Sequence, residues 1–202
     1  MKTNKIRVSN NGNGWDEAFA ETEKYADYRQ LDKKQKLHIR LLAEELLGMV
    51  NSIAGDFQAN FWIDDDENAY YVHLRAAMAM DKNIRSTLLH TSTTGKNAAA
   101  KGIMGKLRDV FQSYLVSKND VVNVSSDYYG GFSGNASSEM SAFSSSNLWS
   151  LSSYKETVLG EKSENAKEKW DELEKSIIAN ISDDVTVGIN GDFVEMMVTK
   201  KL

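Results

Sequence analysis

Two adjacent glutamates, Glu44 and Glu45, are the first residues whose type and setting suggest chemistry. They lie in residues 33–54, where apolar side chains recur every three or four positions and predict an amphipathic helix. A carboxylate at the boundary of such an apolar face can serve as a general base. The simpler interpretation is that one glutamate is a solvated charge and the other a structural carboxylate at the edge of the core.

A second group of candidate residues surrounds a predicted helix start. Gly102 and Gly105 open an amphipathic helix, and the unpaired N–H groups of a helix start can face a phosphate. Lys96 and Lys101 precede this start and would supply positive charge from a polar loop. The pattern predicts an anion-binding site, whereas the alternative is a solvated loop followed by an ordinary helix.

The histidines and the acidic turn do not predict a metal site. His38, His73 and His90 have no His-x-x-x-His spacing and no cysteine partner, so zinc is not expected and we interpret them as surface or boundary residues. The acidic turn at residues 64–67 lacks the glycine of an EF-hand loop. It is therefore interpreted as the solvated tip of a hairpin.

The elements that position these candidates follow from apolar periodicity and turn residues. Helices are expected over residues 15–30, 33–54, a segment from Gly102, and a last segment from Ser163 to Ile181, with Asp32 as the cap of the second. Strands are expected over residues 5–9, 57–63, 69–77, 121–124, 184–189 and 192–199. Tyr71 and His73 should share one face of their strand, and Asn190-Gly191 is typical of a hairpin turn.

These elements predict an α+β fold. We expect a two-layer sandwich in which helices pack on one face of a mixed, mostly antiparallel sheet, and a single domain over residues 1–202. Residues 125–153 are rich in serine and glycine but carry aromatic residues, so they are expected to form a partly packed excursion with an extended end at 148–154. The predicted core contains Leu42, Leu46, Met49, Ile53, Leu107, Val110, Trp170, Ile177 and Val194.

The order of helices, strands, polar loop and glycine-led helix resembles the GHKL superfamily of histidine-kinase-like ATP-binding domains. It is most similar to the small anti-sigma-factor kinases. The resemblance is strongest at residues 37–50, 101–110 and 190–202, and it covers most of the chain apart from the serine-rich excursion.

The resemblance implies roles for particular residues. Glu45 takes the position of the acid that activates the attacking water or hydroxyl. Met49 takes the position of the asparagine that holds Mg²⁺, and a thioether is a poor ligand for this hard cation. Asp81 is the candidate for the aspartate that contacts the adenine, although residues 75–83 lack the glycines that accompany this aspartate in the family. Gly102 and Gly105 correspond to a second glycine motif of the family, which opens a helix near the phosphates.

These departures favour a regulatory module of histidine-kinase-like fold over an enzyme. Such a module would bind nucleotide weakly or not at all and would act through protein contacts. The alternative is an active ATP-binding protein kinase or ATPase of the anti-sigma-factor kinase type with an atypical metal site. ATP with Mg²⁺ would then be its cofactor.

Composition narrows the partners and the compartment. A formal net charge of -5 and a pI near 5.3 argue against binding to nucleic acid or to an anionic membrane. The chain has no cysteine, no signal-like apolar run after residues 1–5, and no run of about 20 apolar residues. A cytoplasmic protein with a protein partner is expected, and a homodimer is one form this partnership could take.

Overall fold

The computed structural model describes residues 1–51, 53, 57–77, 103–116, 148–161, 164–190 and 193–202. Within these residues, six strands form one sheet in the order β1-β2-β3-β6-β5-β4, and every pairing between them is antiparallel. The strands are β1 (Ile6–Ser9), β2 (Gln58–Asp65), β3 (Ala69–Ala77), β4 (Leu148–Ser150), β5 (Asp184–Asn190) and β6 (Phe193–Lys201).

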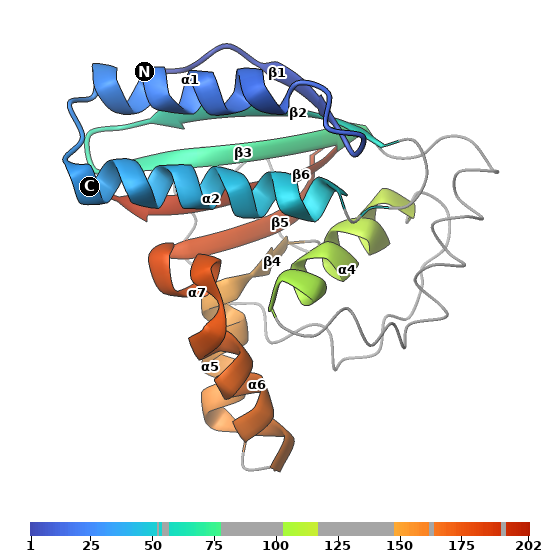
Figure 1. Ribbon diagram of the computed structural model, residues 1–202. Coiled ribbons are helices and arrows are strands. Elements are labelled where there is room, and N and C mark those ends of the chain that lie inside the picture. The colour runs from blue at the N-terminus through green and yellow to red at the C-terminus, as the bar shows by residue number, and fades with distance from the viewer. Residues whose placement is uncertain (52, 54–56, 78–102, 117–147, 162–163, 191–192) are drawn as a thin grey trace.

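Helices cover one face of this sheet, as Figure 1 shows. Lying on this face are α1 (Trp15–Tyr28), α2 (Lys33–Asn51), α4 (Ile103–Val116) and the short α7 (Ile177–Ile181). Two further helices, α5 (Leu151–Gly160) and α6 (Glu164–Lys175), lie side by side and project away from the sheet. The predicted α+β class with helices on one face is therefore confirmed.

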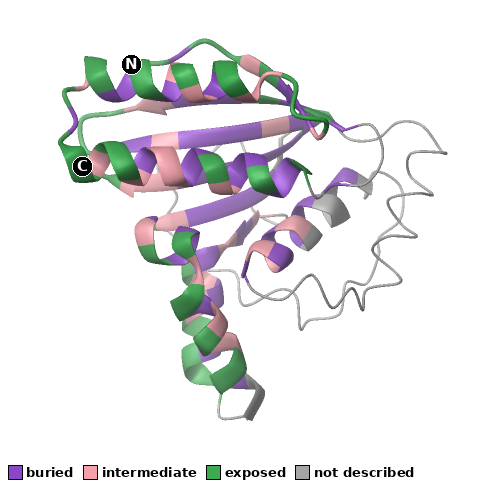
Figure 2. Ribbon diagram, viewed as in Figure 1, coloured by how far each residue is buried: buried purple, intermediate pink, exposed green. Residues whose placement is uncertain are grey.

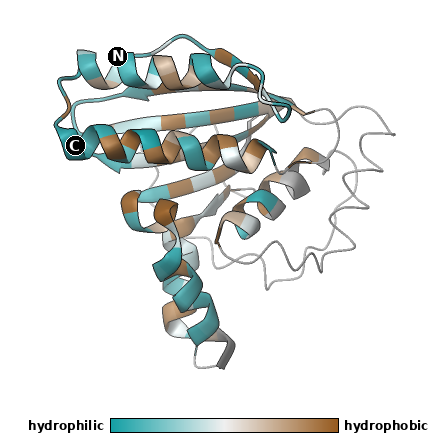
Figure 3. Ribbon diagram, in the orientation of Figure 1, coloured by the Kyte–Doolittle hydropathy of each residue, from teal (hydrophilic) through white to brown (hydrophobic). Residues whose placement is uncertain are grey.

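One hydrophobic cluster fills the space between the helices and the sheet. Its members are spread along the chain, from Val8 near the N-terminus to Val198 near the C-terminus. Figure 2 shows the buried residues of α1 and α2 on the side that faces the strands, and Figure 3 shows that hydrophobic and hydrophilic residues alternate around α2. The apolar stripe of the sequence is thus the packed face of the helix.

Local sequence signals explain several element boundaries. Asp32 and Gln35 form a capping box, in which the Gln35 N–H donates to Asp32 Oδ1 (2.8 Å) and the Asp32 N–H donates to Gln35 Oε1 (2.9 Å). The β2–β3 hairpin is closed by Asp66, whose Oδ1 accepts from the N–H groups of Asn68 and Ala69. The predicted cap and hairpin are confirmed, but the solvated tip is shorter than predicted, because Asp64 and Asp65 belong to β2 and their side chains are 14% and 2% exposed.

The last predicted helix is divided in the structure. Ser176 begins a new helix, α7, because its Oγ accepts a hydrogen bond from the Ala179 N–H. Ile177, the first residue of α7, is 42% exposed, and Trp170 on the projecting α6 is only partly buried, so the prediction that these two are core residues was wrong. The other seven predicted core residues are buried.

Two smaller expectations are also corrected. Only residues 148–150 of the expected extended end are a strand, because Ser150 Oγ accepts from the Ser153 N–H and caps α5 at Leu151. Helix α2 ends at Asn51 rather than near residue 54. The predicted strand at 121–124 lies outside the described residues.

Candidate functional site

The predicted general base lies beside a cavity of 470 Å³. This volume is within the range of about 300–1,000 Å³ that is usual for small-ligand pockets. Four helices and one cap supply its lining: Glu45 from α2, Ile103 and Met104 from α4, Glu172 and Lys175 from α6, Ser176, and Ile177 from α7. The structure therefore brings Glu45 to the start of α4, two places that the sequence analysis treated as parts of one site.

The two adjacent glutamates have different surroundings. Glu44 is exposed and accepts a hydrogen bond from Arg40 Nε at 2.9 Å. Glu45 is half-buried, and burial, followed by repulsion from Glu44, raises the pKa of its carboxyl. No described residue forms a hydrogen bond or an ion pair with the Glu45 side chain. This division agrees with the interpretation of one solvated charge and one carboxylate at the core boundary.

Met49, one turn beyond Glu45, is a core residue. Its side chain is only 4% exposed and belongs to the hydrophobic cluster. It does not line the cavity, and Asn51, the nearest asparagine on this helix, is exposed at the end of α2. The residue that the resemblance places at the magnesium-ligand position is thus a packed core side chain, and its thioether is a poor ligand for this cation.

The remaining predicted nucleotide-binding residues can be placed only in part. Gly105 is buried in the first turn of α4. Lys96, Lys101, Gly102 and Asp81 lie outside the described residues. Within the described part of the chain, no group of three or more His, Asp or Glu side chains is arranged to hold a metal ion.

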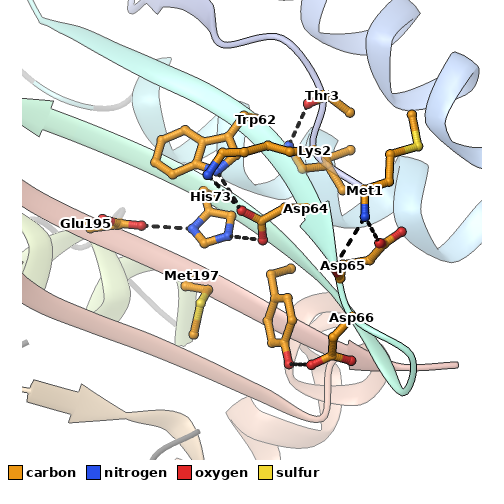
Figure 4. Close-up of polar contacts among 12 residues, drawn as sticks. Met1, Lys2, Thr3, Trp62, Asp64, Asp65, Asp66, His73, Glu195 and Met197 are labelled. Carbon is orange, nitrogen blue, oxygen red and sulfur yellow. Dashed lines mark hydrogen bonds and ion pairs between the residues drawn. The ribbon is translucent and has the colours of Figure 1, made fainter. Parts of the chain in front are cut away.

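A second polar cluster lies across β2, β3 and β6, on side chains that point away from the hydrophobic cluster (Figure 4). His73 is at its centre: Nε2 lies 3.0 Å from Asp64 Oδ1, and Nδ1 lies 2.8 Å from Glu195 Oε1. Two further cations approach the carboxylates, because Lys2 Nζ lies 3.1 Å from Asp64 and Arg75 Nε lies 3.3 Å from Glu195.

The carboxylates favour the charged form of His73. Burial alone lowers the pKa of the imidazole, but the hydrogen bonds that Asp64 and Glu195 accept from the ring outweigh burial and raise the pKa overall. For Asp64, burial raises the pKa of the carboxyl, yet the contacts with His73 and Lys2 prevail and lower it to about 2. The cluster thus holds a buried imidazole between two carboxylates that favour its protonated form.

An aromatic ring completes the surroundings of His73. Trp62 stacks on the imidazole with ring centroids 4.5 Å apart and an angle of 7° between the planes. The ammonium groups of Lys2 and Lys5 lie 5.4 Å and 4.8 Å from the centroid of the Trp62 ring. Because both nitrogens of His73 already have carboxylate partners, the ring is not free to exchange a proton with a substrate, and we assign the cluster a structural role.

The interpretation of His73 as a surface or boundary residue was wrong, since His73 is 4% exposed. The expectation that Tyr71 and His73 share a face is confirmed. Polar residues at alternate positions in the hairpin, with Asp64 and His73 on the same face, were the available signal. The other partner, Glu195, is 122 residues away in the sequence, so no local pattern identifies it.

Comparison with known proteins gives no relative: no family model, no curated protein and no solved structure matches the chain. Among the described helices, none is both long enough and apolar enough to cross a membrane.

Proposed function

We propose that this chain is a regulatory module of histidine-kinase-like ATPase fold that binds nucleotide weakly or not at all and acts through protein contacts. The main support for this proposal is the burial of Met49. In the GHKL arrangement this position would supply an oxygen ligand to Mg²⁺, and positioned metal provides much of the charge stabilisation in phosphoryl transfer. A buried thioether provides none.

The charges around the cavity support the same conclusion. Its described lining has two carboxylates, Glu45 and Glu172, and one ammonium group, Lys175. A triphosphate would bring several negative charges toward these carboxylates, and the half-buried Glu45 would be stabilised by a positive charge instead. The two carboxylates therefore disfavour the binding of ATP, which the family resemblance would otherwise suggest.

A role in protein contacts is supported by the shape of the molecule. Helices α5 and α6 project from the sheet, and Leu159 near the end of α5 is 67% exposed. A projecting pair of helices with exposed apolar side chains is suited to contact a partner. We place the protein in the cytoplasm as part of the same proposal, on its lack of cysteine.

Calorimetric titration with Mg-ATP, combined with an assay of phosphate release, tests this function. We expect a Kd of about 1 mM or weaker, no release above background, and no change in Glu45→Gln. Glu44→Gln is the matched control, because it removes the exposed neighbouring charge and leaves Glu45 in place. Micromolar binding of Mg-ATP would overturn the proposal, and phosphate release that is lost only in Glu45→Gln would establish the alternative, an active kinase or ATPase.

A further inference from the structure

The cavity beside Glu45 has an apolar wall and, in its described lining, more negative than positive side chains. Ile103, Met104 and Ile177 supply the apolar surface, and the described lining has one more carboxylate than ammonium group. Ile177 is 42% exposed, so this wall has apolar area left to bury. A ligand that matches the cavity must therefore have an aliphatic part and a positive charge.

Glu45 gives the strongest reason to expect a cation. A carboxylate that is partly removed from water is costly unless a cation or donor compensates it. The nearest cation along the helix, Arg40, is engaged by Glu44 and by Glu23, at 2.9 Å and 2.8 Å. Lys175 also lines the cavity, but it is exposed and forms no ion pair with Glu45.

A cation of the neighbouring helix is also engaged elsewhere. Lys106 on α4 donates a hydrogen bond to the Tyr154 hydroxyl at 2.6 Å, and its Nζ lies 4.3 Å from the centroid of the same ring. It is not part of the cavity lining. The described chain thus leaves the charge of Glu45 without a cationic partner.

We propose that the cavity receives an arginine side chain presented by a protein partner. Its aliphatic stem would lie against Ile103, Met104 and Ile177, and its guanidinium would face the half-buried carboxylate of Glu45. This inference rests on the proposed function, because it names the chemistry of one protein contact. Arginine fits better than lysine because its guanidinium is more weakly hydrated, stays charged on burial and pairs with carboxylates through several donors.

Peptide titration followed by nuclear magnetic resonance tests the proposal with the full chain. The probe is the capped pentapeptide Ala-Ala-Arg-Ala-Ala, and the matched peptide carries citrulline, which keeps the shape of arginine without the charge. We expect a millimolar Kd for the arginine peptide and at least about tenfold weaker binding of the citrulline peptide, as charge-assisted hydrogen bonds imply. Backbone signals of Ile103, Met104 and Ile177 should shift on titration.

Variants separate the charge from the apolar wall. Glu45→Gln should weaken the arginine peptide at least fivefold, and Ile177→Ser, at an exposed position that should not disturb folding, should weaken both peptides. Glu44→Gln should bind as the unaltered chain does. Equal affinity for the arginine and citrulline peptides, or unchanged affinity in Glu45→Gln, would overturn the inference, as would capped arginine alone binding as tightly as the pentapeptide.

The outcome is separable from that of the proposed function. Failure of the arginine peptide to bind, in a protein that also fails to bind Mg-ATP, removes only this inference. Micromolar Mg-ATP binding removes the proposed function, whatever the peptide does.

Discussion

Replacing His73 by glutamine removes the imidazole that joins β2, β3 and β6. The side chains of its two partners, Asp64 and Glu195, are 14% and 8% exposed, and breaking a buried ion pair costs roughly 3–5 kcal/mol. Each carboxylate keeps one cation, Lys2 for Asp64 and Arg75 for Glu195. We therefore expect a loss near the lower end of that range, about 3 kcal/mol in the free energy of unfolding at pH 5–6.

The size of this loss should depend on pH. The pKa of His73 is raised above 6.5 in the folded protein, so its contribution to stability is fully present below pH 6.5 and disappears as the pH rises through the folded pKa. The pKa of Asp64 is lowered from 3.8 to about 2, so its contribution is present above pH 3.8 and disappears as the pH falls through about 2. The difference between the unaltered chain and His73→Gln should be largest between these limits, from about pH 4 to 6.5.

Urea unfolding followed by far-ultraviolet circular dichroism, at intervals from pH 4 to pH 9, measures this difference. His38→Gln is the matched control, because burial, followed by repulsion from Lys34, lowers the pKa of His38, and the sign of its pH dependence is opposite. A difference for His73→Gln that stays constant from pH 5 to pH 9, or that grows with rising pH, would refute the reasoning.

Two further predictions concern the packing of the fold and can be checked by the same unfolding measurement at neutral pH. Leu46→Ala, at a fully buried position of α2, should lower the free energy of unfolding by about 2–5 kcal/mol, and a loss below 1 kcal/mol would contradict the placement of this side chain in the core. Gly14→Ala should cost more than Gly12→Ala: both glycines have a positive φ, but a Cβ at Gly14 would lie 2.0 Å from the carbonyl oxygen of Arg7, whereas nothing lies within 4 Å of a Cβ at Gly12. Gly12→Ala should show only the backbone strain of about 1–3 kcal/mol, and equal losses in the two variants would contradict the close approach of Gly14 to β1.

The features that depend on neighbouring residues can be predicted from the sequence. The apolar repeat of α2 predicts its buried stripe, including Leu46 and Met49, because residues three or four apart lie on the same side of a helix. The capping box of Asp32 and Gln35 is equally local. From these signals follow the α+β class, the β2–β3 hairpin and the position of Glu45 at the edge of an apolar face.

Contacts between distant residues follow only from the way in which separate elements pack. The pairing of β3 with β6 brings His73 to Glu195, and the spacing of residues within either strand contains no information about that register. The cavity beside Glu45 likewise depends on the residue at which α6 ends. Ser176 caps α7 at this point, and Ile177, the first residue of α7, lines the cavity. Local patterns fix which face of an element is apolar, whereas the partners of a buried charge are fixed only when separate elements pack, because the free energy of that charge depends on every group around it.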